Sequence, residues 1–90
     1  MKIEVTERDI KLGMKTMVSN TKCPVARALH RAGFKNVLVG VSSVSRKDRP
    51  DRVAIRLPEH VSHLIHIMCG NNPPNPFSFN LTKRQVATLS

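Results

Sequence analysis

Four histidines are the first residues in this chain whose type and spacing could support chemistry. His60, His63 and His66 recur at every third position of a segment expected to be helical, so neighbouring imidazoles would share one face. Imidazole is a common zinc ligand, and His30 could complete a site. Steps of three drift around a helix, however, and no C-x-x-C or H-E-x-x-H pattern is present. The spacing therefore favours surface or interface histidines, and we predict neither a metal nor another cofactor.

Nucleophilic and acid–base chemistry find little support. Cys23 would stand at a helix N-terminus, where the helix dipole can lower a thiol pKa, but a small buried residue at a cap is the simpler interpretation. His30 lies two turns further along the same helix, too far to bond the thiol. Asp48 and Asp51 belong to a basic segment and do not suggest a general acid–base pair. With no secretory signal, Cys23 and Cys69 are expected to be reduced. We predict no catalytic residues and no enzymatic activity.

Positive charge is the strongest functional signal. The 90 residues include 15 Lys and Arg against 6 Asp and Glu, a net charge of +9, and only two of the cations follow residue 58. Such an excess favours nucleic acid, a nucleotide or an acidic protein surface, although a solvated face is the alternative. The predicted binding residues are Arg27, Arg31, Lys35, Arg46, Lys47, Arg49, Arg52 and Arg56.

Two kinds of partner remain open for this basic surface. A small basic domain can cover an acidic groove on a host protein or nucleoprotein complex, and Arg is favoured at interface hot spots. The same cations could instead contact the phosphates of a nucleic acid or nucleotide. Phe34 is the only aromatic residue nearby, which argues against a single-strand reader that stacks bases. Charge reversal at Arg27 and Arg31 should weaken either kind of binding, and we expect folding to survive it.

The element that must position these residues is a helix–strand–turn–strand unit over residues 22–58. Pro24 suits the first helical position and Gly33 the left-handed position after the end. Between them an apolar stripe at i, i+3, i+4 and i+7 defines one face, and Arg27 and Arg31 lie away from it. Alternating apolar residues predict strands over 37–44 and 53–57 that form a hairpin. A charged turn would join them.

Local signals also divide the rest of the chain. Thr6 and Asp9 have capping-box spacing, and Gly13 would end the short helix that they begin. The other expected elements are a strand over 2–5, a loop over 14–22, a helix over 59–69, an extended connector over 71–76 and a strand from 77 to 81.

The predicted order, β-α-α-β-β-α-β, is typical of the α+β class. We expect a small two-layer domain over residues 1–81, with a mostly antiparallel sheet and its helices on one face, followed by a polar C-terminal tail over 82–90. The aromatic-poor core makes a homodimer reasonable. No apolar run approaches the roughly 20 residues of a membrane span, and no signal peptide is visible at the start. A cytoplasmic protein without membrane association is therefore expected.

Three motifs resemble those of a family of small uncharacterised proteins encoded by tailed phages and prophages. IEVTERDIKLG fits I-x-V-T-x-x-x-I-x-x-G, CPVARAL fits C-P-[IV]-A-x-A-[IL], and PFSFNL fits P-F-x-F-x-L. Family members have a shorter segment before C-P and a more charged third helix. The resemblance brings no catalytic residues. It implies an accessory protein of the host bacterial cytoplasm that blocks or modulates a host macromolecule, with anti-defence and anti-CRISPR roles among the functions of such proteins.

Overall fold

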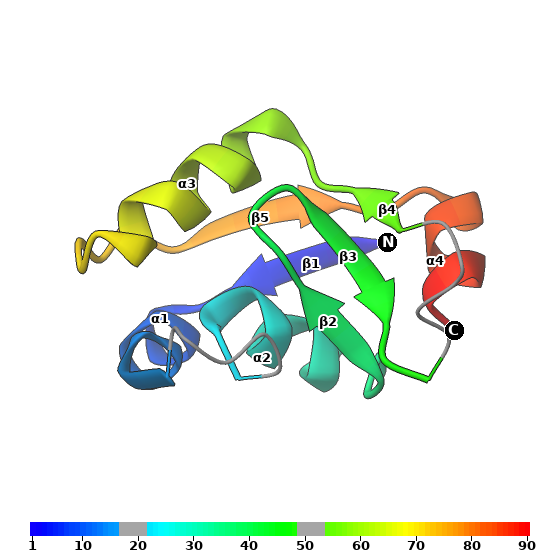
Figure 1. The fold of residues 1–90 in the computed structure, drawn as a ribbon, viewed down its shortest axis with the longest axis horizontal. Helices are drawn as coiled ribbons and strands as arrows, with labels where there is room; N and C mark the ends of the chain where they lie inside the picture. The colour runs from blue at the N-terminus through cyan, green and yellow to red at the C-terminus, as the bar shows by residue number, and fades with distance from the viewer. Residues whose placement is uncertain (17–21, 49–53) are drawn as a thin grey trace.

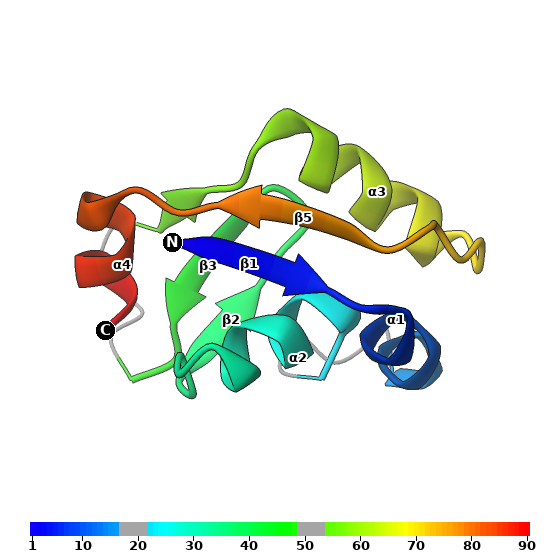
Figure 2. The same ribbon diagram turned by 180° about the vertical axis from the view of Figure 1, so that it is seen from behind.

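The first and last strands of the chain lie side by side, although almost the whole sequence separates them. β1 (Lys2–Val5) pairs antiparallel with β5 (Phe77–Asn80), with Ile3 opposite Phe79 (Figure 1). The computed structural model describes residues 1–16, 22–48 and 54–90. Within them a second antiparallel sheet has the strand order β2-β3-β4. Figure 2, seen from behind, brings β1 and β5 to the front, so the two sheets lie on different sides of the domain.

The remaining elements follow one another closely along the chain. In order they are α1 (Glu7–Gly13), the short 3-10 helix η1 (Met14–Thr16), α2 (Pro24–Arg31), β2 (Val37–Val39), β3 (Ser43–Arg46), β4 (Ile55–Arg56), α3 (Glu59–Cys69) and α4 (Lys83–Leu89). The α+β class and the antiparallel pairing are thereby confirmed, and the predicted order is consistent with the observed one, which adds one strand and the helix α4. None of the described helices is long and apolar enough to cross a membrane.

Aliphatic side chains build the core, as the scarcity of aromatic residues requires. Val25, Val61 and Met68 are completely buried, and they come from α2 and α3. Ile3 and Phe79 add the inward face of the β1–β5 pair. The buried cluster thus takes members from both sheets and from the helices, which fixes the orientation of each helix.

The helix boundaries follow the local signals in the sequence. At α1, Thr6 Oγ1 accepts a hydrogen bond from the Asp9 backbone N–H, and Asp9 Oδ2 accepts one from the Thr6 N–H, which completes the capping box. Pro24 is the first residue of α2. Beyond its end Gly33 has a φ of +110°, a conformation that side chains with a Cβ rarely adopt.

The strand expected over 37–44 is two strands, and that prediction was wrong. The chain turns over residues 40–42, where the Gly40 N–H donates to the Ser43 carbonyl at 2.8 Å. Val41 continues the apolar alternation in the sequence, but it is exposed at this turn. β3 then pairs with β2 on one side and with β4 on the other. Residue 53, expected at the start of a strand, lies outside the described residues.

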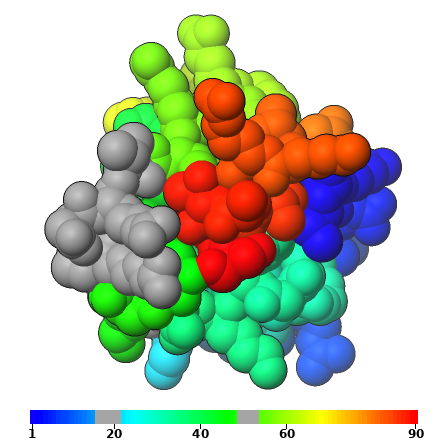
Figure 3. All heavy atoms as spheres, turned by 90° about the vertical axis from the view of Figure 1, so that its right-hand side faces the viewer, coloured from blue at the N-terminus to red at the C-terminus, as the bar shows by residue number. Residues whose placement is uncertain are grey.

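The expected polar tail is largely a helix. Thr82 and Gln85 form a second capping box at the start of α4, and Leu89 near its end is buried in the core. Figure 3 shows α4, in red, surrounded by other parts of the chain. The spacing of Val86 and Leu89 gives this short helix an apolar edge, and packing of that edge stabilises it.

Candidate anion-binding site

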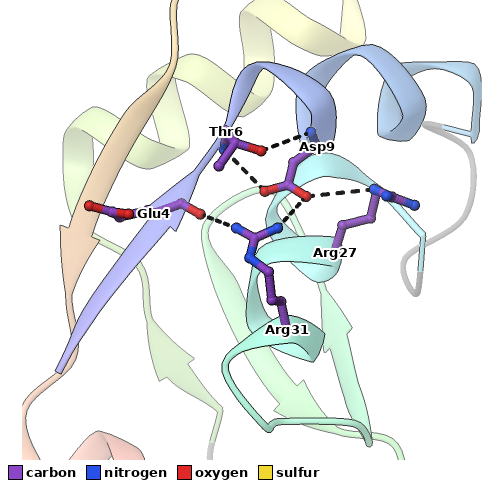
Figure 4. Close-up of polar contacts among 5 residues, drawn as sticks. All are labelled: Glu4, Thr6, Asp9, Arg27 and Arg31. Carbon is purple, nitrogen blue, oxygen red and sulfur yellow. Dashed lines mark hydrogen bonds and ion pairs between the residues drawn. The ribbon is translucent and has the colours of Figure 1, made fainter.

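A buried carboxylate fixes the helix that carries the central arginines. The side chain of Asp9 is only 2% exposed. Besides its capping contacts, its Oδ1 accepts a hydrogen bond from Arg31 Nη1 at 2.7 Å, and Arg31 Nη2 donates to the Glu4 carbonyl at 2.7 Å (Figure 4). One side chain of α2 is therefore bonded to both α1 and β1. These hydrogen bonds fix the positions of α1, α2 and β1 relative to one another.

Protonation equilibria favour the charged form of this pair. Burial by itself raises the pKa of the Asp9 carboxyl, but hydrogen bonds from Arg31 and Thr6 and the positive charge of Arg31 outweigh it. The pKa of Asp9 therefore lies below its ordinary value. The hydrogen bond to Asp9 in turn raises the pKa of Arg31. Both groups are ionised at neutral pH, so the bridge is a charge-assisted one.

Arg27 has a looser relation to the same carboxylate. Its Nε lies 3.7 Å from Asp9 Oδ1 and makes no hydrogen bond. In Figure 4 the terminal nitrogens of Arg27 point away from the Asp9 carboxylate, and 37% of the side chain is exposed. The side chain of Arg27 is therefore partly exposed and can meet a ligand.

Arg27 lines an open depression of about 640 Å³ on the side of α2 next to η1. The described lining residues are Leu12, Lys15, Lys22, Arg27, His30, Lys35, Asn36 and Lys47. Five of them are cations, and no acidic residue is among them. We call this surface the basic depression. Its composition predicts a strongly positive local potential that attracts anions.

Backbone contacts bring the cations of the basic depression together from separate elements. The Lys47 N–H, just after β3, donates to the Asn36 carbonyl before β2 at 2.7 Å. This bond places the backbone of Lys47 beside the segment that carries Lys35. Lys22 lies just before α2, and Lys15 belongs to η1, which follows α1. The site thus depends on the packing of α1, α2 and the β2–β3 hairpin.

The structure divides the residues that the sequence predicted for binding. Arg27, Lys35 and Lys47 meet in the basic depression. Arg31 instead lines a smaller hollow of about 290 Å³ beside β1 and forms an ion pair with Asp9. Its main contacts are structural, whereas the sequence predicted that charge reversal at Arg31 would leave folding intact.

The other predicted cations lie apart from the basic depression or cannot be placed. Arg46 binds the Asp48 carboxylate with Nε and Nη2, at 2.9 and 2.7 Å, and also donates to the backbone oxygen of Ser90. Arg56 is exposed on β4. Arg49 and Arg52 lie outside the described residues, so their place relative to the basic depression stays a prediction.

Lys15, Lys22 and His30 are the members of the basic depression that sequence reasoning did not assign to an anion site. Lys22 directly precedes the Cys-Pro start of α2, and this adjacency was a usable signal. Lys15 lies in a segment without periodicity, and its position depends on how α1 packs against α2. His30 is one turn from Arg27 on the same helix, and its Nε2 is buried with no hydrogen-bond partner.

The remaining histidines and the cysteines do not form a site together. His60, His63 and His66 are exposed on α3, and His60 Nε2 lies 3.0 Å from the Ser78 carbonyl oxygen. In the parts of the chain that the structure describes, no three His, Cys, Asp or Glu side chains converge on a point. Cys23 is buried, and burial raises the pKa of its thiol, which makes it a poor nucleophile. The thiol of Cys69 is free and exposed.

No family model, curated protein or solved structure matches this chain. The resemblance to phage accessory proteins therefore stays a prediction that depends on the three sequence motifs. Function has to be argued from the basic depression and from the contacts that build it.

Proposed function

We propose that this protein is a non-catalytic binding protein that blocks or modulates an anionic macromolecule of a bacterial host through the basic depression. The observation that carries the proposal is the gathering of five cations, with no acidic residue among the described residues that line the hollow. The resemblance to phage accessory proteins supports a host component as the partner and the host cytoplasm as the place of action.

The chemistry of the lining residues supports binding over catalysis. Lys and Arg side chains stay protonated at neutral pH, so they attract an anion but do not act as general bases. His30 is the one described lining residue whose side chain could act as a general acid or base, and no carboxylate or thiol is among the described residues that line the hollow. Among the described residues that line the hollow, a bound substrate would therefore meet neither a nucleophile nor an acid–base pair.

The binding set differs from the one that the sequence predicted. Lys15, Arg27, Lys35 and Lys47 are the principal contacts that we propose, and Lys22 completes the surface. Arg31 and Arg46 act as supports, because each is already bonded to a carboxylate.

Two charge-matched double variants test this proposal. Lys35→Ala with Lys47→Ala removes two charges from the basic depression, whereas Lys83→Ala with Arg84→Ala removes two from the exposed start of α4. The salt concentration that elutes each protein from immobilised heparin, a sulfated polyanion, measures anion binding. We expect the first variant to elute at clearly lower salt than the second, because the cations of the depression act together.

Equal elution of the two variants would overturn the proposal, since net charge alone would then explain retention. Thermal unfolding followed by circular dichroism provides the control for folding. Lys35 and Lys47 are both exposed, so their truncation should leave the melting temperature nearly unchanged.

A further inference from the structure

We infer that the macromolecule is duplex nucleic acid, bound through its phosphate backbone without recognition of bases. This inference rests on the proposed function and names the chemical class of its partner. Three observations on the basic depression carry it: the kind of cations present, their distribution over the surface and the burial of Phe34, which precedes Lys35 in the chain.

The kind of cation distinguishes phosphate from an acidic protein surface. Four of the five described cations are Lys, and only Arg27 is an arginine. Protein interfaces enrich Arg and aromatic residues and deplete Lys, because a buried ammonium pays a high desolvation and ordering cost. Lys acts as a point charge whose ammonium group can donate to a phosphate oxygen in many orientations, without the planar match that Arg makes to carboxylates. The composition therefore favours phosphates over protein carboxylates.

The distribution of the cations fits a repeating charge better than one isolated anion. Lys15 comes from η1, Lys35 from the segment after α2 and Lys47 from the position just after β3, so they approach an open hollow from different parts of the fold. A duplex carries one negative charge per about 1.7 Å of its axis, so several phosphates can lie against such a surface together. Asn36 adds a neutral amide, a group that commonly donates to phosphate or sugar oxygens.

The surroundings of Phe34 favour a duplex over a single strand. Proteins that hold single strands without sequence preference stack the bases on exposed aromatic rings. No aromatic side chain is among the described residues that line the depression, and Phe34, next to Lys35, is only 5% exposed. With no ring available for stacking, the contacts left are those to the backbone. A duplex presents two such backbones at high charge density.

Fluorescence anisotropy with labelled probes tests the inference. The probes are a 20-base-pair DNA duplex, an RNA duplex of the same sequence, each single strand, a DNA duplex of scrambled sequence and a labelled polyglutamate. We expect the duplexes to bind at least several-fold more tightly than the single strands and polyglutamate, and the two DNA sequences to bind alike. Tighter binding to the DNA duplex or to the RNA duplex identifies which nucleic acid supplies the phosphate backbone.

Salt dependence measures how many phosphates the cations contact. Each phosphate contact adds about −0.9 to the slope of log K against log salt for duplex DNA, measured between about 50 and 200 mM. Removal of Lys35 and Lys47 should lower the magnitude of the slope by about 2, and removal of Lys83 and Arg84 should leave it unchanged. Tighter binding to single strands or polyglutamate, or an equal slope in both variants, would overturn the inference.

The heparin and anisotropy experiments fail in different ways. Retention on heparin that depends on Lys35 and Lys47, without duplex binding at 50 mM salt, would refute the duplex and leave the proposed function standing. Loss of both signals from the wild-type protein would refute both.

Discussion

Arg31 Nη1 lies 2.7 Å from Oδ1 of Asp9, and this contact links a half-exposed cation on α2 to a carboxylate that is almost completely buried on α1. The second terminal nitrogen of Arg31 donates to the Glu4 carbonyl on β1. Arg31, one of the residues that the sequence predicted as ligand contacts, therefore cross-links elements of the fold. Its partner Asp9 also caps α1, so one carboxylate serves two structural roles.

Substitution of Arg31 should destabilise the fold. Arg31→Ala leaves the buried Asp9 carboxylate without its strongest donor, and an unsatisfied buried group costs about 1–3 kcal/mol. Arg31→Glu should cost more, since it places a second negative charge there. Urea denaturation measures the effect, with Arg8→Glu on the exposed part of α1 as the charge-matched control. Equal stability of the two reversed variants would contradict the structural role of Arg31.

Acid should remove the contribution of Asp9 to stability. Because the folded-state pKa of Asp9 lies below its value in the unfolded chain, the stabilisation is complete above about pH 4 and is lost as the pH falls through the lowered folded-state pKa. Asp9→Asn lacks this titration. The difference in unfolding free energy between wild type and Asp9→Asn should therefore shrink as the pH falls from 5 towards about 2. A constant difference would show that the carboxylate is not preferentially ionised in the folded state.

Gly13 should not tolerate a side chain, although alanine is the better helix former. A Cβ at Gly13 would lie 2.4 Å from the backbone nitrogen of Pro24 and 2.7 Å from its Cα. These are backbone atoms at the start of α2, so relief of the clash requires the two helices to separate. We expect Gly13→Ala to cost about 1–3 kcal/mol in thermal or urea unfolding.

Gly70→Ala is the matched control for the clash at Gly13. A Cβ at Gly70 meets nothing closer than 3.4 Å, and φ there is −86°. Its effect should stay within about 0.5 kcal/mol. If Gly13→Ala were equally mild, the close approach of α1 to α2 would not be rigid.

Leu89 should contribute to stability as a core residue. Its side chain is 4% exposed and belongs to the main buried cluster. Buried Leu→Ala changes cost about 2–5 kcal/mol, and the short helix α4 suggests the lower end of this range. Lys83→Ala, on an exposed site of the same helix, is the control. Unfolding curves that coincide for the two variants would show that residues 82–90 are a tail outside the domain.

Helix ends were predictable because their signals are local. Thr6 and Asp9 are three residues apart, and Pro24 and Gly33 delimit α2 through their own backbone preferences. The prediction of one strand over 37–44 was wrong because the alternation of apolar and polar residues gives no indication of a turn. Val41 keeps the period of two, yet the chain reverses there. A capping box before Val86 and Leu89 was also a local signal, and the polar composition of residues 82–90 obscured it.

The candidate site was less predictable because tertiary contacts build it. The positive charge in the sequence singled out Arg27, Lys35 and Lys47, which line the basic depression, but it did not indicate which cations are bonded to carboxylates. The contact between Arg31 and Asp9 spans 22 residues, and the backbone bond between Lys47 and Asn36 crosses a hairpin that the sequence misplaced. Charge composition predicts that a basic surface exists, whereas the packing of α1, α2 and the β2–β3 hairpin determines which side chains share it.

The pairing of β1 with β5 has a consequence for synthesis on the ribosome. Ile3 and Val5 lie opposite Phe79 and Phe77, which are translated more than 70 residues later. At about 5–20 residues per second, the nascent chain waits on the order of 4–15 s before its opening strand can find its partner. The side chains of Ile3 and Val5 remain accessible to chaperones during that interval, and this part of the core forms only after Phe77 and Phe79 have left the exit tunnel.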